Sequence, residues 1–332
     1  MSLRLARNGT PDSVTSDTGS PCCAPRRAPE RTAVTRQAMQ PGNRTANVNL
    51  VELGGGVFRM GCDRREGHPL DHEGPTRQVE LRPFAIAETA VTNAEFALFV
   101  EESGYVTDAE RFGWSFVFDG LLTQEASQAV RGQAYTNPWW LGVDGAYWRC
   151  PFGPGSDIEE LNDHPVVHVS WHDADAYCTW ARLRLPTEAE WEYASRGGLK
   201  GKRFPWGDDL TPSGVWRCNI WQGEFPRMNT AEDGYVATAP VRSYEPNGFG
   251  LYQTSGNVWE WSQDCFAPLD ESEREHEKHY PAGQPTEMPK AIRGGSYLCH
   301  HSYCNRYRVA ARSSSTPDSS GGNVGFRCVL DV

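Results

Sequence analysis

Short alternations of apolar and polar residues, separated by glycine and proline, run through most of this chain. The first two, at 48–53 and 57–60, flank three successive glycines, and this arrangement predicts a hairpin. A third alternation at 79–86 predicts another strand, in which Pro83 indicates an edge or a bulge. Further short strands are expected at 291–293 and 325–329.

Three other segments have the period of a helix and the chemistry of a helix start. Each begins with Ser or Thr followed three residues later by Asp or Glu, a pair that caps the first turn. The pairs are Thr92 with Glu95, Ser170 with Asp173, and Thr187 with Glu190. Glycines at 104 and at 197–198 predict the ends of the first and third helices. After Gly201 turn residues recur every few positions, so the pattern favours an α+β domain with long ordered loops and little regular secondary structure.

Composition and charge narrow the class of protein. The chain has 33 glycines, 23 prolines and 12 tryptophans, a mixture typical of a loop-rich domain with aromatic packing. Residues 1–46 are rich in Arg, Pro, Ser and Thr and lack periodicity, so we expect a disordered N-terminal arm before a single domain at 47–332. The net charge of −11 argues against a nucleic-acid partner. No apolar run is long enough for a membrane span or a secretion signal, so we expect a cytoplasmic protein without a membrane partner. We also expect a monomer.

Two of the ten cysteines, Cys299 and Cys304, lie five positions apart in a segment rich in His, Tyr and Arg. One interpretation is a small-loop disulfide or a pair of buried structural thiols, because cysteine is often buried. The other is a reactive site, because cationic neighbours favour the thiolate. Those neighbours are His300, His301, Arg306 and Arg308. Two soft sulfur ligands without a third suit Cu(I) better than tetrahedral zinc.

Several motifs around this pair resemble a known family. In the last forty residues they are Arg293-Gly-Gly-Ser-Tyr-Leu-Cys299, Arg306-Tyr-Arg308, Ala310-Ala-Arg-Ser, Thr316-Pro-Asp-Ser-Ser and Gly325-Phe-Arg-Cys328. Upstream, Arg184-Leu-Pro-Thr-Glu-Ala-Glu-Trp-Glu-Tyr193 and Gly256-Asn-Val-Trp-Glu-Trp261 belong to the same pattern. Together they resemble the formylglycine-generating enzymes, or sulfatase-modifying factors, from about Asn47 to the C-terminus. Non-enzymatic relatives share each motif, and the cysteine pair favours the active branch. The resemblance implies a C-type-lectin-like fold.

The resemblance also implies an activity. Cys299 and Cys304 would hold Cu(I), the substrate cysteine would join as a further sulfur ligand, and O2 would react there. A hydrogen would leave the substrate Cβ, and hydrolysis would give Cα-formylglycine from the cysteine of a Cys-x-Pro-x-Arg motif in an unfolded sulfatase precursor, with a thiol reductant supplying the remaining electrons. Ser296 would be a polar catalytic group beside the pair. The residues that would bind substrate are Trp139, Tyr303, His300 and Asn323. The alternative for Trp139 and Trp140 is ordinary core packing.

Two calcium sites are implied by the same matching, and oxygen ligands from loops suit this ion. The first set is Asn219, Ile220, Asp233 and Tyr235; the second is Gln253, Gly256, Val258 and Glu260. The alternative for the first set is that Asn and Asp simply stabilise turns. In the second set Gln253 stands where relatives often have Asn, which puts that site in doubt.

The chain departs from the family pattern at other positions. Cys178 and Cys328 match a disulfide of secreted relatives, and in a reducing compartment two buried thiols are the alternative. Trp114 replaces an acidic residue that meets the substrate arginine in some relatives, so we expect Asp119 or Asp108 to take that role.

The arm itself contains Cys23-Ala-Pro-Arg-Arg27, which fits Cys-x-Pro-x-Arg. Coincidence is one explanation in an Arg- and Pro-rich segment. The other is that the arm occupies the substrate groove or is itself oxidised at Cys23, since a tethered motif competes at high effective concentration.

Two further functions remain as alternatives to the copper oxidase. A non-catalytic peptide-binding module on the same fold would not need both thiols. An iron-dependent sulfoxide synthase needs a His-x-x-x-His-x-Glu helix, and neither His72-Glu73 nor His168-Val-Ser170 completes that motif.

Overall fold

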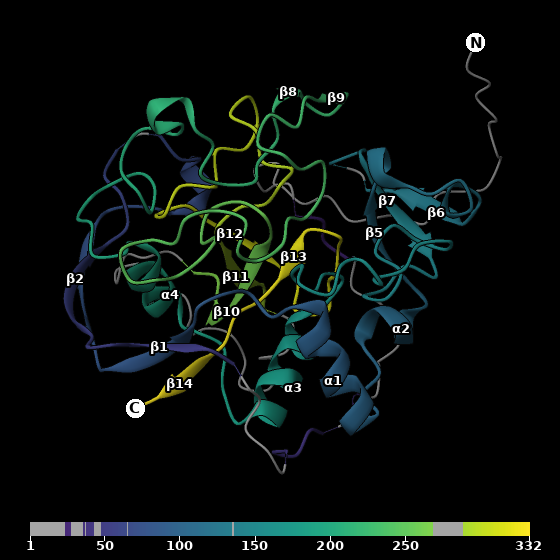
Figure 1. Ribbon diagram of the computed structural model, residues 1–332, viewed down its shortest axis with the longest axis horizontal. Coiled ribbons are helices and arrows are strands. Elements are labelled where there is room, and N and C mark those ends of the chain that lie inside the picture. Colours follow the sequence, from purple (N-terminus) through teal and green to yellow (C-terminus); the bar gives the residue numbers. More distant parts are fainter. Residues whose placement is uncertain are drawn as a thin grey trace.

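The computed structural model describes residues 24–27, 36, 38–42, 48–64, 66–134, 136–267 and 288–332 (Figure 1). A four-stranded mixed sheet lies at the centre, in the order β12 (Arg312–Ser315), β11 (Lys290–Arg293), β10 (Trp259–Cys265) and β13 (Val324–Gly325). β10 is antiparallel to β11 and parallel to β13, so Glu260 is flanked by Arg293 and Gly325. The sheet therefore brings the motifs around 260, 293 and 325 side by side.

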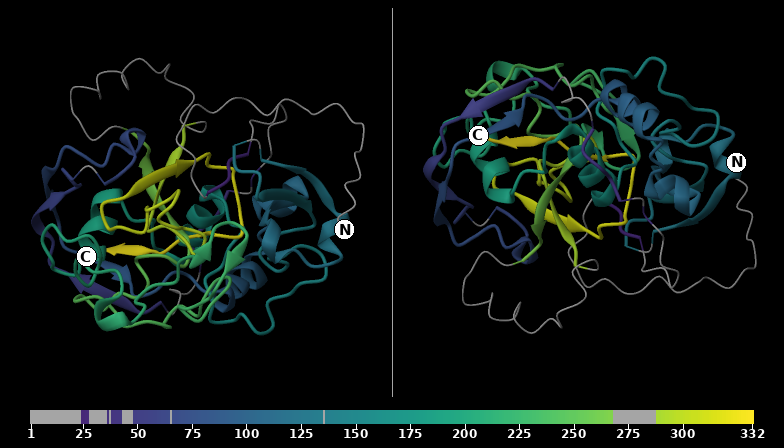
Figure 2. Two further views of the ribbon diagram at one scale, coloured as in Figure 1. Left: turned by 90° about the horizontal axis from the view of Figure 1, so that it is seen from above. Right: turned by 90° about the horizontal axis from the view of Figure 1, so that it is seen from below.

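Four smaller sheets surround this centre. They are β1 (Leu50–Leu53), β4 (Phe84–Ala87) and β14 (Val329–Asp331); β2 (Gly56–Met60) with β3 (Arg77–Leu81); β5 (Trp114–Phe118), β7 (Trp140–Asp144) and β6 (Val130–Gln133); and β8 (Gly223–Glu224) with β9 (Met228–Asn229). Figure 2 shows residues 50–81 and the β5–β7–β6 sheet on opposite flanks of the C-terminal strands. In the first of these sheets, β4 pairs with both the early strand β1 and the last strand β14.

The predicted hairpin at 48–60 is wrong, because β1 pairs with β4 and β2 pairs with β3. Gly55 and Gly56, with φ of 67° and 100°, turn the chain between the two pairings. A Cβ on Gly55 would lie 2.4 Å from the Leu81 carbonyl oxygen, so the turn is packed against the end of β3. The single strand predicted at 79–86 is likewise two strands, which separate at Pro83.

The capping pairs predicted three of the four α-helices in the described residues: α1 (Asn93–Ser103), α3 (Trp171–Ala181) and α4 (Glu188–Ser195). All three have reciprocal capping boxes, and Gly104 ends α1 with φ of 65°. The missed helix, α2 (Asp108–Phe112), has the same signature in Thr107 and Glu110 but only five residues. Four 3-10 turns complete the described helices: η1 (Pro69–Asp71), η2 (Asp119–Leu121), η3 (Ala126–Gln128) and η4 (Pro212–Gly214). None of the helices in this part of the chain is long and apolar enough to cross a membrane.

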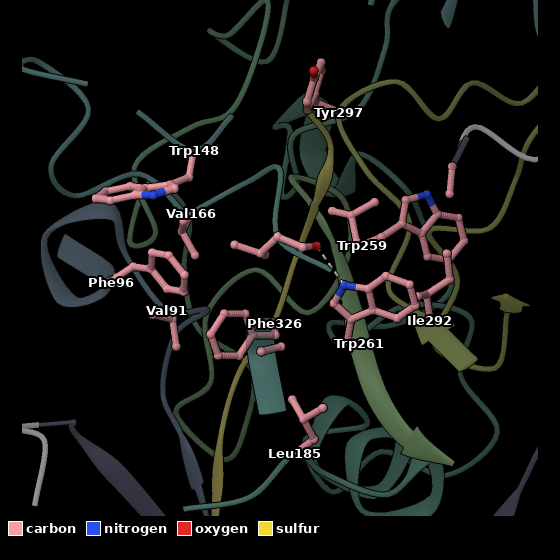
Figure 3. Close-up of a cluster of buried hydrophobic side chains, with 14 of the residues drawn as sticks. Val91, Phe96, Trp148, Val166, Leu185, Trp259, Trp261, Ile292, Tyr297 and Phe326 are labelled. Carbon is pink, nitrogen blue, oxygen red and sulfur yellow. Dashed lines mark hydrogen bonds between the residues drawn. The ribbon is translucent and has the colours of Figure 1, made fainter. Parts of the chain in front are cut away.

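The core is aromatic, as the composition predicted. Phe96 of α1 packs edge-on against Trp148 and Phe326, and Trp261 of β10 donates its indole N–H to the Val169 carbonyl at 3.1 Å (Figure 3). Tyr297, which precedes Cys299 by two residues, belongs to the same buried cluster. The loop that carries the cysteine pair is therefore anchored in the main core.

Candidate active site

Cys299 and Cys304 lie together in the segment between β11 and β12, which we call the cysteine loop (residues 294–308). Both are fully buried, and their sulfur atoms are 3.0 Å apart. The Cys304 N–H donates to the His300 carbonyl at 2.8 Å, which closes the turn between them. The Cys299 carbonyl accepts from the main-chain N–H of Trp221 at 3.0 Å. The chain thus presents two converging soft donors, and within the described residues no cluster of three or more His, Cys, Asp and Glu side chains suited to a metal occurs.

Buried ion pairs hold the C-terminal side of this loop. Arg306 donates to both Asp71 oxygens, at 2.6 and 2.9 Å, and Arg308 donates to both Glu73 oxygens, at 2.7 and 2.6 Å. The two arginines that were expected to favour the thiolate are each paired with a carboxylate, so their positive charge is largely compensated. Burial, together with the neighbouring His301, lowers the pKa of His300, so this ring adds no charge near neutral pH.

Ser296 and Asn323 lie beside the pair, as the motifs implied. The Ser296 oxygen accepts from the Asn323 amide at 3.0 Å, and the Ser296 N–H points at the Cys299 sulfur at 3.4 Å. The Asn323 carbonyl accepts from the Trp259 N–H at 2.9 Å, which ties this residue to β10. Residues from two distant segments thus meet at the thiols.

The predicted substrate-binding aromatics lie in one cluster. Tyr303 stacks on Phe225 with ring centroids 4.1 Å apart, and Trp139 lies edge-on to both, at 5.6 and 5.0 Å. Trp139 is half-buried, and its indole nitrogen has no hydrogen-bond partner among the described residues. Trp140, by contrast, is fully buried, as the core-packing interpretation predicts, and the substrate-binding role of Trp139 stays a prediction. His300 is turned away, with Nδ1 2.8 Å from the Ser302 hydroxyl and its ring against His301.

Residues 24–27 of the arm lie in a groove between β12 and β5. Ala24, Pro25 and Arg27 are buried, whereas the sequence predicted a disordered segment. The Pro25 carbonyl accepts from Ser315 at 3.1 Å, the Arg27 N–H donates to Ser319 at 2.6 Å, and the Arg26 guanidinium donates to the Ser314 hydroxyl at 2.9 Å. Cys23, which begins the motif, lies outside the described residues, and its oxidation stays a prediction.

Aromatic faces enclose the Arg27 side chain. Its guanidinium carbon is 4.0 Å from the Phe112 ring centroid and 3.7 Å from that of Trp114, and it donates to the Trp114 carbonyl at 3.0 Å. Asp108, one of the acids expected to meet a substrate arginine, instead binds Arg36 and Ser170, at 3.0 and 2.9 Å. The tryptophan that replaces the acid is itself the arginine contact.

The buried side chain of His168 supports the β5 side of this groove. His168 lies between the Ser115 hydroxyl and the Pro151 carbonyl, each at 2.8 Å, and Ser115 contacts Ser320 at 2.8 Å. Burial lowers the pKa of His168 to about 4, so the ring is neutral. Because a carbonyl only accepts, Nε2 carries the proton and Nδ1 accepts from Ser115. From the sequence, this histidine was considered only as part of an incomplete iron-binding motif, and its supporting role was missed.

The first calcium set comes together around Asp233. Its carboxylate accepts from the N–H groups of Ile220 and Tyr235, at 2.9 and 3.0 Å, and burial raises its pKa. The side-chain oxygen of Asn219 is buried with no hydrogen-bond partner among the described residues, although its amide donates to the Ala237 carbonyl at 2.8 Å. An uncommitted buried oxygen beside a carboxylate fits a hard cation.

The second set fits less well. The Gln253 side-chain oxygen is also buried without a partner among the described residues. Glu260, however, binds Arg327 through both oxygens, at 2.6 and 2.7 Å, and also accepts from the Trp191 indole at 2.6 Å. Glu260 was predicted to hold calcium together with Gly256 and Val258. It is the one carboxylate of this set, and it already forms an ion pair.

Two other features lie away from these residues. Cys178 and Cys328 are buried thiols 3.3 Å apart and not bonded to each other. A cavity of about 880 Å³ opens between β2 and the segment at 196–203, and none of the predicted site residues lines it. The groove is not a cavity of this kind, because the arm fills it.

Comparison with known proteins agrees with the motifs. Residues 35–332 match the family described as Sulfatase-modifying factor enzyme 1-like domain. The chain therefore belongs to this family, as the resemblance predicted, and it has the family's C-type-lectin-like α+β fold.

Curated relatives are more specific. The chain is 61% identical to a formylglycine-generating enzyme of Streptomyces coelicolor over 85% of this chain and 89% of that protein. It is 55% identical to one of Thermomonospora curvata, over 85% and 93%. Among solved structures, PvdO from Pseudomonas aeruginosa shares the fold, with a TM-score of 0.61 at 24% identity, over 89% of this chain and all of that one.

Proposed function

We propose that this chain uses copper, O2 and a thiol reductant to convert the cysteine of a Cys-x-Pro-x-Arg motif in unfolded sulfatase precursors to Cα-formylglycine. By close homology it is a formylglycine-generating enzyme. The observation that carries the copper part of the proposal is the buried pair of thiols 3.0 Å apart. A cytoplasmic location and a monomeric state stay predictions.

The overall reaction balances with these reactants. The substrate cysteine loses two electrons and two protons to give a thioaldehyde, and hydrolysis of the thioaldehyde releases H2S and leaves an aldehyde whose oxygen comes from water. O2 accepts four electrons in all and leaves as two molecules of water, one of which replaces the water used in the hydrolysis. Two molecules of external thiol become one disulfide and supply the two remaining electrons, so the protein itself is unchanged at the end of a turnover.

The cysteine pair would hold the metal. Two thiolates are the soft ligands that Cu(I) prefers, and low coordination leaves room for a substrate sulfur. When bound, copper would supply the reactivity toward O2. Burial of both sulfurs keeps bulk water away from the pair.

The neighbouring residues would position the reactants. The Ser296 hydroxyl lies beside the cysteine pair and accepts from Asn323, and we assign it a role in positioning oxygen or substrate. The Trp139 indole N–H, which has no partner among the described residues, is a donor for the substrate main chain. Tyr303 and Phe225 would cover the reacting sulfur with apolar surface.

Calcium would stabilise the loop on the far side of Cys299. We propose the first set, Asn219, Ile220, Asp233 and Tyr235, as its site, on the strength of the buried Asn219 oxygen. Ile220 is followed by Trp221, whose N–H holds the Cys299 carbonyl, so the ion would act on the metal site through two residues. Added calcium should raise the unfolding temperature of wild type, measured by scanning calorimetry, and should leave that of Asn219→Ala unchanged.

Mass spectrometry of a peptide such as Leu-Cys-Thr-Pro-Ser-Arg tests the oxidase. Wild type with Cu(I), O2 and thiol should remove sulfur and leave an aldehyde, and Cys299→Ser and Cys304→Ser should each abolish conversion. Cys178→Ser is the matched control, because Cys178 and Cys328 form a second close buried pair outside the site. Binding of peptide and copper without conversion would contradict the proposal and support a peptide-binding module.

A further inference from the structure

The groove is already filled by a segment of this chain. Ala24 joins the buried cluster that contains Cys299 and Cys304, and Ser314, Ser315 and Ser319 are buried beneath the arm. Arg26 and Pro25 contact the serines of β12, and the Arg27 carbonyl accepts from Thr316 at 3.5 Å. Four consecutive residues thus follow one continuous path from the two rings that enclose Arg27 to Ala24, which is buried in the main core.

Gly321 leaves room for a proline ring at one position of this path. A Cβ added to Gly321 would lie 3.0 Å from the Pro25 ring, a tight approach that would make the ring shift by a few tenths of an ångström. The absence of a side chain at 321 therefore makes the space in which the proline ring lies. Two residues further along, the gap between Phe112 and Trp114 takes a flat cation.

The occupant has the sequence pattern of the implied substrate. Pro25 and Arg27 stand two and four positions after Cys23, as in Cys-x-Pro-x-Arg. Its main-chain contacts, from Ser315 to the Pro25 carbonyl and from the Arg27 N–H to Ser319, do not depend on side-chain identity. Any peptide with proline and arginine at this spacing can make the same contacts, so arm and peptide exclude each other.

We propose that residues 24–27 are a tethered occupant of the peptide groove, which competes with substrate peptides and raises the concentration at which they bind. The inference rests on the proposed function only for the identity of those peptides. Attachment gives the arm an effective concentration on the order of millimolar, so even a weak tetrapeptide contact keeps the groove partly filled. The apparent affinity for free peptide falls by the fraction of time that the groove is open.

Binding without turnover gives the first test. The probe is Leu-Ser-Thr-Pro-Ser-Arg, in which serine replaces the reactive cysteine, titrated calorimetrically into the metal-free full chain. Arg27→Ala and Pro25→Ala should each bind the probe about threefold to tenfold more tightly than wild type. Arg26→Ala should have a smaller effect, because Arg26 is only half-buried and its guanidinium donates to Ser314 instead of lying between the two rings. Arg59→Ala, an exposed arginine of β2 paired with Asp63, should have none.

Steady-state kinetics gives the second test. With the cysteine peptide, Arg27→Ala should lower KM by the same factor as the binding constant and leave kcat unchanged, because only the arm is altered. Equal probe affinity in wild type, Arg27→Ala and Pro25→Ala would overturn the inference, whatever the turnover. Tighter binding in these variants without any conversion would keep the inference and contradict the proposed oxidase instead.

Discussion

Two regions of this molecule hold arginine side chains by different chemistry. At the C-terminal end of the cysteine loop, Arg306 and Arg308 are buried and each makes two hydrogen bonds to a carboxylate. In the groove, Arg27 lies between two aromatic rings and donates to a main-chain carbonyl. The first arrangement is permanent, because removing either partner leaves a buried charge.

The groove arrangement, in contrast, suits a ligand that comes and goes. Ring faces and a carbonyl carry no net charge, so they stay satisfied by water or by a new guanidinium when the arginine leaves. The difference separates the part of the molecule that holds the thiols in place from the part that exchanges its occupant.

Removing a carboxylate beside the cysteine loop should have the largest effect. Glu73→Gln leaves Arg308 buried without its counter-charge, and we expect unfolding in urea to show a loss of about 3–5 kcal/mol. The double change Glu73→Leu with Arg308→Met should recover part of this loss, since no charge is then left buried. Arg59→Ala breaks an exposed pair and should cost at most about 1 kcal/mol. A loss from Glu73→Gln as small as that would show that the buried pairs do not hold the loop.

Because buried His168 supports the groove in its neutral form, the free energy of unfolding should depend on pH. The folded-state pKa of His168 is lowered to about 4, against about 6.5 in the unfolded chain, so between these values the unfolded state binds the extra proton. Stability contributed by neutral His168 is therefore present above pH 6.5 and decreases as pH falls toward 4. At pH 5 the decrease amounts to about 2 kcal/mol.

His168→Gln should remove this part of the slope and keep hydrogen-bonding atoms at both ends. The test uses the difference in unfolding free energy between wild type and variant at each pH, because other buried groups also titrate in this range. Burial lowers the pKa of His172 to about 4, and burial and the nearby Asp108 raise the pKa of Asp173 to about 7. His172 adds a slope of the same sign and Asp173 one of the opposite sign. Parallel urea midpoints of wild type and variant across pH 4.5–7 would contradict the assignment.

Loss of the arginine clamp, formed by Phe112 and Trp114, should weaken peptide binding by about tenfold when it is tested in the Arg27→Ala background, where the arm no longer competes for the clamp. Trp114→Ala removes one ring face, and cation–π contacts at partly desolvated sites are worth about 1–2 kcal/mol. The test compares KM for Leu-Cys-Thr-Pro-Ser-Arg with KM for the same peptide ending in Ala. Only the arginine peptide should be affected by the substitution, and an equal loss for both would show that Trp114 acts through general packing.

The smallest effect, about threefold in KM, is expected from a methyl group in the proline space, tested in the Arg27→Ala background so that release of the arm does not mask it. Gly321→Ala places a Cβ 3.0 Å from the position of the Pro25 ring, and a small shift of the ligand can relieve most of that contact. A peptide with Ala in place of Pro should lose less than the proline peptide. Stronger binding of the proline peptide to the variant would exclude Gly321 as the proline contact.

Local sequence patterns predicted the elements whose causes are local. Capping pairs located α1, α3 and α4, and the reciprocal hydrogen bonds that cause them span only three residues. The cysteine pair was equally accessible, since a five-residue spacing in a turn brings two side chains together. The same signature at Thr107 and Glu110 could have located α2.

Contacts between distant segments were decided by the tertiary structure. The predicted hairpin failed because β1 and β2 found partners in other parts of the chain. Asp71 and Glu73 neutralise arginines 235 positions away, and no local pattern specifies such a pairing. The positive charge expected around the thiols is largely compensated for this reason.

By itself, then, the sequence determined the family, the thiol pair, three helices and the proline–arginine motif of the arm, because each depends on residues close together in the chain. Only the tertiary structure showed that Phe112, Trp114, Ser315, Ser319 and Gly321 form one groove and that residues 24–27 lie in it. Burial and long-range hydrogen bonds select among the many pairings that local chemistry allows, so they appear only once the chain has folded.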